Sequence, residues 1–227
     1  MNPEQKGFYK YLLVISDSDL IGGITMLIEK EKYLSAGVNI GTRRRVEDMK
    51  PFIYRIKKNK LAIINLDKTN ERIEIAGKFL SRYDPEDILV ISRKEIGHKP
   101  IVKFSEATGA RNIYGRFMPG TLTNPNNDDF IEPKVIIITD PLEDSQAANE
   151  AIEARIPVIS LCDTVNKLEY IDYAIPCNNK GRKSLAVVYY LLAREYMKNR
   201  DLIESDDEFE FDIEDFEADE SVEEEKE

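Results

Sequence analysis

The sequence predicts an α/β fold, a three-layer αβα sandwich around a mostly parallel sheet. Two observations carry this prediction. Short runs such as ILVIS (88–92) and VIIIT (135–139) are continuously apolar, which is typical of parallel strands covered on both faces. Segments with helical periodicity separate the runs, and strands that alternate with helices form βαβ units.

The predicted elements follow in chain order. Strands are expected at 61–66, 88–92, 112–114, 135–139 and 158–161, with a sixth candidate at 173–175. Helices are expected at 28–36, 67–83, 100–108, 144–155 and 184–199, and Asp67 or Thr69 can cap the start of the second. The stretch 52–66 can also form a hairpin across Lys58 and Asn59 that feeds the first parallel strand. The loop 116–131, rich in Pro, Gly and Asn, is either functional or a cover for a strand end.

Charge divides the chain into a basic body and an acidic tail. The 227 residues carry a formal −11, yet residues 201–227 hold 16 Asp/Glu and one Lys, so residues 1–200 carry +4. Like charges at this density repel, and the few apolar side chains of the tail offer too little surface to offset the ordering entropy. We therefore expect an N-terminal extension (1–25), an α/β domain (26–200) and a disordered acidic tail (201–227). The tail can act as a solubiliser, as a nucleic-acid mimic that shields the basic body, or as a docking motif through Phe209, Phe211, Ile213 and Phe216.

Composition also limits compartment and class. Two cysteines without CxxC spacing indicate a reducing compartment. No stretch is typical of a targeting signal, and the longest apolar run (185–193) is shorter than the roughly 20 residues that cross a bilayer. A soluble, cytoplasmic protein is the expectation.

A search for catalytic residues yields little. Asp67, Asp140 and Asp163 follow predicted strands and could hold a metal, although Asp after a strand more often caps a helix or a turn. His98 is the only histidine, and Cys162 ends an apolar strand, where a buried thiol is favoured over a nucleophile. The segment NKGRKS (179–184) lacks the glycine spacing of a phosphate loop. We expect no catalytic residue, no metal and no cofactor.

Basic residues gather in three places. Residues 43–60 carry eight Lys/Arg against two acids, and Arg43, Arg44 and Arg45 repel each other unless an anion lies near. The second cluster, NNKGRKS (178–184), lies at the start of the last helix, where cations oppose the helix dipole unless an anion binds there. A third set is scattered over residues 93–116. Together they predict binding of RNA backbone by Asn39, Thr42, Arg43, Arg44, Arg45, Lys50, Arg55, Arg93, His98, Lys99, Arg111, Arg116, Asn178, Asn179, Lys180, Arg182 and Lys183.

Several long strings make the chain resemble the archaeal branch of the small-subunit ribosomal protein S2 family, whose eukaryotic counterpart is ribosomal protein SA, the laminin receptor precursor. Among them are EKYLSAGVNIGT (31–42), DMKPFIYRI (48–56), TGARNIYGRFMPGTLTNP (108–125) and IPCNNKGRKSLAVVYYLLARE (175–195). They occur in the order of the family and cover most of residues 27–200.

The resemblance implies a flavodoxin-like, Rossmann-like sheet and a structural role without catalysis in the small ribosomal subunit. It also implies small-subunit rRNA and neighbouring ribosomal proteins as partners, with no membrane and no small-molecule substrate. Two positions depart from the pattern. Asn39 stands where the family usually shows His, and Leu142 stands where Asp-Pro is usually followed by Arg.

Overall fold

A five-stranded parallel sheet forms the centre of the protein in the computed structural model, which describes residues 26–219. Its strand order is β4-β3-β5-β6-β7, and every neighbouring pair is parallel. The predicted α/β sandwich is confirmed, and the sixth candidate strand (173–175) belongs to the sheet. The strands are β3 (Ile88–Ser92), β4 (Arg111–Tyr114), β5 (Val135–Ile138), β6 (Val158–Cys162) and β7 (Tyr173–Pro176).

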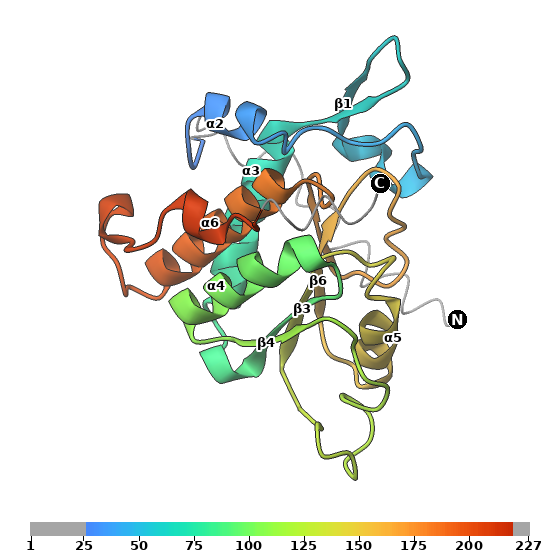
Figure 1. Cartoon of the computed structure of the whole chain (residues 1–227), viewed down its shortest axis with the longest axis vertical. Coiled ribbons are helices and arrows are strands. Elements are labelled where there is room, and N and C mark those ends of the chain that lie inside the picture. The colour runs from blue at the N-terminus through green and yellow to red at the C-terminus, as the bar shows by residue number, and fades with distance from the viewer. Residues whose placement is uncertain (1–25, 220–227) are drawn as a thin grey trace.

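The prediction that the apolar run 61–66 forms a strand of the parallel sheet is wrong. β1 (Ile53–Ile56) and β2 (Ala62–Ile64) form a separate two-stranded antiparallel sheet, which extends from the body at the top of Figure 1. An isolated bridge joins Ile40 to Ile63, so β2 already has a partner on each side. The hairpin alternative for residues 52–66 is therefore correct, and the parallel sheet begins with β3.

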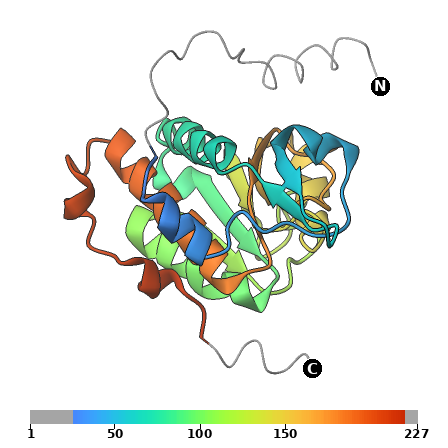
Figure 2. The same cartoon turned by 90° about the horizontal axis from the view of Figure 1, so that it is seen from above.

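Helices cover the sheet unequally. α3 (Leu66–Leu80), α4 (His98–Thr108) and α6 (Arg182–Asn199) pack on one face, and α5 (Ser145–Glu153) lies on the other (Figures 1 and 2). Ile88 and Val90 point into the first core, whereas Leu89 and Ile91 point into the second. This alternation explains why the strand is apolar throughout, since both faces of the pleat are buried.

The loop 116–131 completes the second core. Phe117 and Leu122 are buried there, and the carboxylate of Glu150 on α5 accepts hydrogen bonds from the backbone N–H groups of Gly120 (2.8 Å) and Leu122 (3.1 Å). Burial alone raises the pKa of Glu150, but these bonds, with others from Gln146 and Thr123, lower it. In the structure this loop therefore packs on α5 and on the second face of the sheet.

Helix starts differ from the prediction at several helices; α4, for example, begins at His98, two residues before the predicted start. α3 is capped by Asn65, whose side chain accepts a hydrogen bond from the N–H of Asp67 (3.0 Å), rather than by Asp67 or Thr69. α6 begins at Arg182, two residues earlier than predicted, and no side chain caps it. The remaining short elements are α2 (Lys30–Ser35), η1 (Glu47–Phe52), η2 (Pro85–Asp87) and η3 (Glu95–Gly97).

The expectation of a disordered tail is wrong for residues 201–219. This segment contains η4 (Asp206–Glu208) and η5 (Ile213–Phe216), and Phe216 is fully buried in the main core. The aromatic side chains of this segment pack on the main core, and their apolar contacts order it despite its high charge density. Residues 220–227 of the predicted tail and the predicted extension 1–25 lie outside the described residues.

Both cysteines, Cys162 and Cys177, are buried free thiols. Burial raises the pKa of each thiol, in agreement with an unreactive Cys162. Within residues 26–219, no helix combines the length and the apolar character of a membrane span.

Candidate nucleic-acid interface

The arginine triplet is held by its backbone. The carbonyl oxygen of Arg44 accepts hydrogen bonds from the hydroxyls of Thr42 (2.9 Å) and Thr164 (3.1 Å), and the N–H of Val46 donates to the carbonyl of Thr164 (2.9 Å). A Cβ at Gly41 would lie 2.6 Å from a methyl carbon of Thr164, so only glycine permits this approach. The loop after β6 thus fixes the path of the triplet.

The three guanidinium groups are left available. Arg43, Arg44 and Arg45 are exposed, and within residues 26–219 none of them has an ion-pair partner. Three adjacent uncompensated cations on a fixed backbone favour a bound polyanion, because phosphate groups relieve their mutual repulsion.

The hairpin places further cations near the triplet. Arg55 and Asn39 line a surface hollow of about 280 Å³ between α2 and the β1–β2 hairpin. The turn residues Lys57, Lys58 and Lys60 are exposed. Lys50, by contrast, is paired with Glu47 within η1, so its charge is partly compensated by its own turn.

The second cluster divides into buried and exposed parts. Asn179 was expected to bind RNA, but its side chain is fully buried and its amide donates to the carbonyl of Leu161 (3.0 Å) and to Oδ1 of Asn166 (3.2 Å). It therefore holds the loop before α6 to the sheet and has no access to phosphate. Asn178 also acts on the loop itself, accepting from the N–H of Lys180 (3.0 Å) and donating to the carbonyl of Gly37 (3.2 Å).

The three cations of this cluster differ in their surroundings. Lys180 lies 3.5 Å from the buried carboxylate of Asp163, and Arg182 pairs with Glu217 at 3.1 Å. Lys183 is exposed. The sequence predicts that an anion neutralises the cations at the start of α6. The carboxylate of Glu217, from the same chain, is such an anion.

The third set follows the edge of the sheet around α4 and β4. Arg93, Arg111 and Arg116 are exposed, and the ring of His98 lies 5.4 Å from that of Tyr114. Lys99, at the start of α4, pairs with Asp219 at 3.2 Å. The structure therefore brings Arg93, His98 and Lys99 to the start of α4, beside the start of α6. Arg111 lies at the leading end of β4, on the far side of the strand, and the triplet lies in a separate loop.

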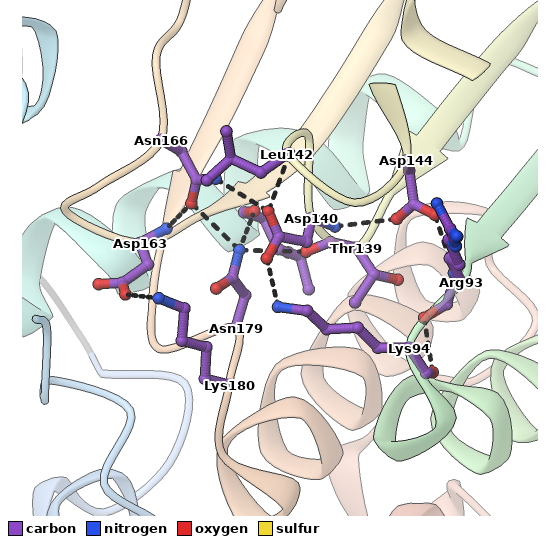
Figure 3. A network of polar contacts seen from close by, with 12 residues as sticks. Arg93, Lys94, Thr139, Asp140, Leu142, Asp144, Asp163, Asn166, Asn179 and Lys180 are labelled. Carbon is purple, nitrogen blue, oxygen red and sulfur yellow. Dashed lines mark hydrogen bonds and ion pairs between the residues drawn. The ribbon is translucent and has the colours of Figure 1, made fainter. Parts of the chain in front are cut away.

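A buried polar network lies where the parallel strands end, and Figure 3 shows it from close by. Lys94 pairs with Asp140, whose other oxygen accepts from the amide of Asn166 (2.9 Å) and the N–H of Leu142 (3.0 Å). Asp144 accepts from the N–H of Arg93 (2.8 Å). These bonds fix the loops that carry Arg93 and Lys180.

The structure bears on the hypothesis that Asp67, Asp140 and Asp163 together hold a metal ion. Asp67 is exposed at the start of α3 and follows β2, which is not part of the parallel sheet. Lys94 and Lys180 already face the other two carboxylates. Among the residues that the structure describes, no group of three His, Cys, Asp or Glu side chains is arranged to hold a metal ion.

Comparison with known proteins places this geometry in a family. Residues 33–129 and 127–198 match the family described as ribosomal protein S2. The chain belongs to the ribosomal protein S2 family. The predicted family resemblance is confirmed, and with it the expectation that the protein is no enzyme, because this family is a structural one.

Archaeal members of the S2 family are similar over most of the chain. A protein of Thermoplasma volcanium named small ribosomal subunit protein uS2 is 53% identical over 193 residues, which are 85% of this chain and 97% of that protein. The uS2 of Thermoplasma acidophilum is 52% identical over the same length. That of Methanococcus maripaludis is 48% identical over 187 residues, 82% of this chain and 85% of that protein.

The sequence prediction does not identify the residues that hold the basic loops in place. Thr164 is absent from the sequence prediction, and Lys94 counts there only as one of the scattered cations of the third set, although both come within three residues of the end of an apolar run and strand-end residues meet at one edge of a parallel sheet. The acidic partners Glu217 and Asp219 were assigned to a disordered tail, and no local pattern indicates that they return to α4 and α6.

Proposed function

We propose that this protein is a structural constituent of the small ribosomal subunit that binds small-subunit rRNA, supports assembly and translation, and performs no catalysis. The observation that carries the proposal is the triplet Arg43, Arg44 and Arg45, exposed and without a counter-charge in the described chain, on a backbone fixed by Thr164. The names of the archaeal relatives support the ribosomal part.

Recognition is proposed to be of RNA backbone rather than of bases. The groups that the site presents are mainly guanidinium and ammonium groups, whose contacts with phosphate oxygens carry no sequence information. The triplet is proposed as the first contact, joined by the exposed Arg55, Arg93, Arg111, Arg116 and Lys183. Neighbouring small-subunit proteins are proposed as further partners, and residence on the ribosome would place the protein in the cytoplasm.

The test is the salt dependence of rRNA binding by the full chain and by the variant R43Q/R44Q/R45Q. Each lost phosphate contact reduces the slope of log K against log [salt] by roughly 0.7–0.9, so the variant slope should be about 2–2.7 smaller. The control K78Q/R82Q/K134Q removes the same charge from three exposed cations elsewhere. A flat salt dependence of the wild-type protein, or equal slopes for the two variants, would overturn the proposal.

A second measurement tests the ribosomal assignment itself. The protein should sediment with the small subunit in a sucrose gradient of its own cell lysate at moderate salt, and should leave it at high salt as phosphate contacts are screened. Recovery of the whole pool as free protein at moderate salt would contradict the assignment.

A further inference from the structure

The acidic segment 203–219, called here the acidic strap, lies against α6 and α4, whose first turns carry Arg182 and Lys99, two residues that the sequence predicts to bind RNA. Figures 1 and 2 show its orange-red to red ribbon beside α6 and α4, and η5 contacts both helices. Its acidic side chains therefore stand next to a basic surface, and its path is defined in the structure.

Aromatic side chains anchor the strap. Phe209 and Phe216 pack edge-on against Tyr190 of α6, with ring centroids 5.3 and 6.0 Å away. Phe216 is fully buried and Phe209 is 9% exposed. Asp212 and Asp215 form a capping box around η5, which fixes the turn that follows the first anchor. Such anchors hold the neighbouring carboxylates at defined places.

Two of these carboxylates form ion pairs with cations that the sequence predicts to bind RNA. Glu217 Oε1 lies 3.1 Å from Arg182 Nε, and Asp219 Oδ1 lies 3.2 Å from Lys99 Nζ. Arg182 is the first residue of α6 and Lys99 is the second residue of α4. The positive ends of the two helix dipoles add to the attraction for an anion there. A carboxylate and a phosphate are both anions, so the two cannot hold the same cation at the same time.

We propose that the acidic strap is an intramolecular competitor of RNA: it fills the cation sites of Arg182 and Lys99 in the free protein, and rRNA must displace it. The inference rests on the proposed RNA-binding function. A tethered anion acts at a high effective concentration, so an isolated phosphate does not displace it. An RNA that also binds the uncovered triplet at Arg43, Arg44 and Arg45 gains enough to do so. The strap thereby selects against short or weakly bound polyanions.

The decisive variant is E217Q/D219N in the full chain, which keeps every aromatic anchor. Its control is E210Q/E214Q, two exposed acids of the strap with the same change in charge and no ion-pair partner in the described chain. With poly(U) as probe at 0.1 M salt, the decisive variant should bind about tenfold more tightly than the control.

The salt slope separates competition from general electrostatics. Salt weakens the ion pairs of the strap with Arg182 and Lys99 as well as the phosphate contacts, so in the wild-type protein part of the salt dependence of RNA binding cancels. The slope of E217Q/D219N should therefore be steeper, by up to about 1.4–1.8 at roughly 0.7–0.9 per phosphate, whereas the control should keep the wild-type slope. Hydrogen exchange of residues 203–219 in the wild-type protein should accelerate when rRNA is added.

The outcomes distinguish the inference from the function beneath it. Equal affinities and slopes for the two acid variants, with strap exchange unchanged by rRNA, would overturn the inference while the effect of R43Q/R44Q/R45Q still upholds RNA binding. Flat salt dependence in every chain would overturn both.

Discussion

The hydroxyl of Thr164 donates a hydrogen bond to the carbonyl oxygen of Arg44 at 3.1 Å, across 120 positions of sequence. The same hydroxyl oxygen accepts from the N–H of Thr42 at 3.0 Å. Thr164 directly follows the β6 strand and Asp163, so these bonds tie the arginine loop to the end of the sheet. The proposed RNA contact is therefore placed by the fold, although its side chains lie in a loop.

Replacing Thr164 by Val removes the hydroxyl and keeps the shape of the side chain. We expect a loss of about 1–2 kcal/mol in the free energy of unfolding, because the groups around it lose buried hydrogen-bond partners. Affinity for rRNA should fall about three- to tenfold, since the loosened arginines must be ordered on binding. Urea denaturation and rRNA titration measure the two effects.

The control for this prediction is Thr123→Val, which removes a hydroxyl that donates to Glu150 at 3.3 Å in a different loop. It should lower stability slightly and leave rRNA affinity unchanged. Wild-type affinity in Thr164→Val would show that the backbone bonds do not matter for binding.

Gly77 tests how closely α3 and α6 approach. A Cβ there would lie 2.6 Å from Cβ of Glu195 and 3.1 Å from its backbone carbon. Helix propensity alone predicts that Gly77→Ala stabilises the protein by up to about 1 kcal/mol. The steric conflict costs about 1–3 kcal/mol, so we expect net destabilisation. Thermal or urea unfolding decides the sign.

Asn149→Ala, on the exposed side of α5, is the matched control for Gly77→Ala because it changes helix propensity without a steric conflict. It should raise stability by a few tenths of a kcal/mol. An equal gain in Gly77→Ala would mean that the two helices can separate at no cost.

The sheet could be predicted from sequence because its signal is local. A continuous run such as 135–139 has one favourable environment, a parallel strand covered on both faces. The run 61–66 is also largely apolar but forms part of a hairpin, because four polar residues (57–60) allow a turn that the pattern of the run does not report. Lys60 adopts a positive φ of 66° there, which nothing in the apolar run indicates.

The site was harder to predict because its partners are distant in sequence. The position of Asn179 before a helix predicts contact with RNA. In the structure its side-chain amide points into the protein, because it donates hydrogen bonds to carbonyl groups at the ends of two neighbouring strands. Phe209 and Phe216 were counted as too few to order an acidic tail. Their contact with Tyr190 depends on how α6 lies in the folded protein, and no spacing within 201–227 reveals it.

Asp144 makes stability depend on pH. Burial raises its pKa to about 7, although N–H groups of Arg93 and Asp140 hydrogen-bond to it. In the unfolded chain an Asp has a pKa of about 3.9. Between about pH 4 and 7 the folded protein thus holds a proton that the unfolded chain has lost, and the stability contributed by this group falls as pH rises through that window.

Asp144→Asn should remove this part of the pH dependence. Relative to the wild-type protein, the variant should gain stability from pH 4.5 to 7.5, by at most about 4 kcal/mol over a shift of some three pKa units. Urea unfolding at several pH values gives the comparison, with the exposed Asp129→Asn as the control. Parallel curves for Asp144→Asn and the wild-type protein would rule out a raised pKa.

Lys94 and Asp140 form an ion pair in which only 18% and 2% of the two side chains are exposed. Asp140→Asn turns an amide N–H₂ or a weaker acceptor toward the ammonium group and leaves a mostly buried cation uncompensated. We expect a loss of about 2–3 kcal/mol, less than for a fully buried pair because Lys94 still reaches water.

A double-mutant cycle isolates the pair. Lys94→Met leaves Asp140 with its two donors, Asn166 and Leu142, and removes the cation that the Asn variant cannot satisfy. The double variant should therefore be more stable than the sum of the single losses predicts, by about 1–2 kcal/mol. The same cycle on the exposed pair of Lys134 and Asp87 should give less than about 1 kcal/mol. Equal coupling in the two cycles would mean that the network at the strand ends is as hydrated as the surface, and that it does not fix the loops of Arg93 and Lys180.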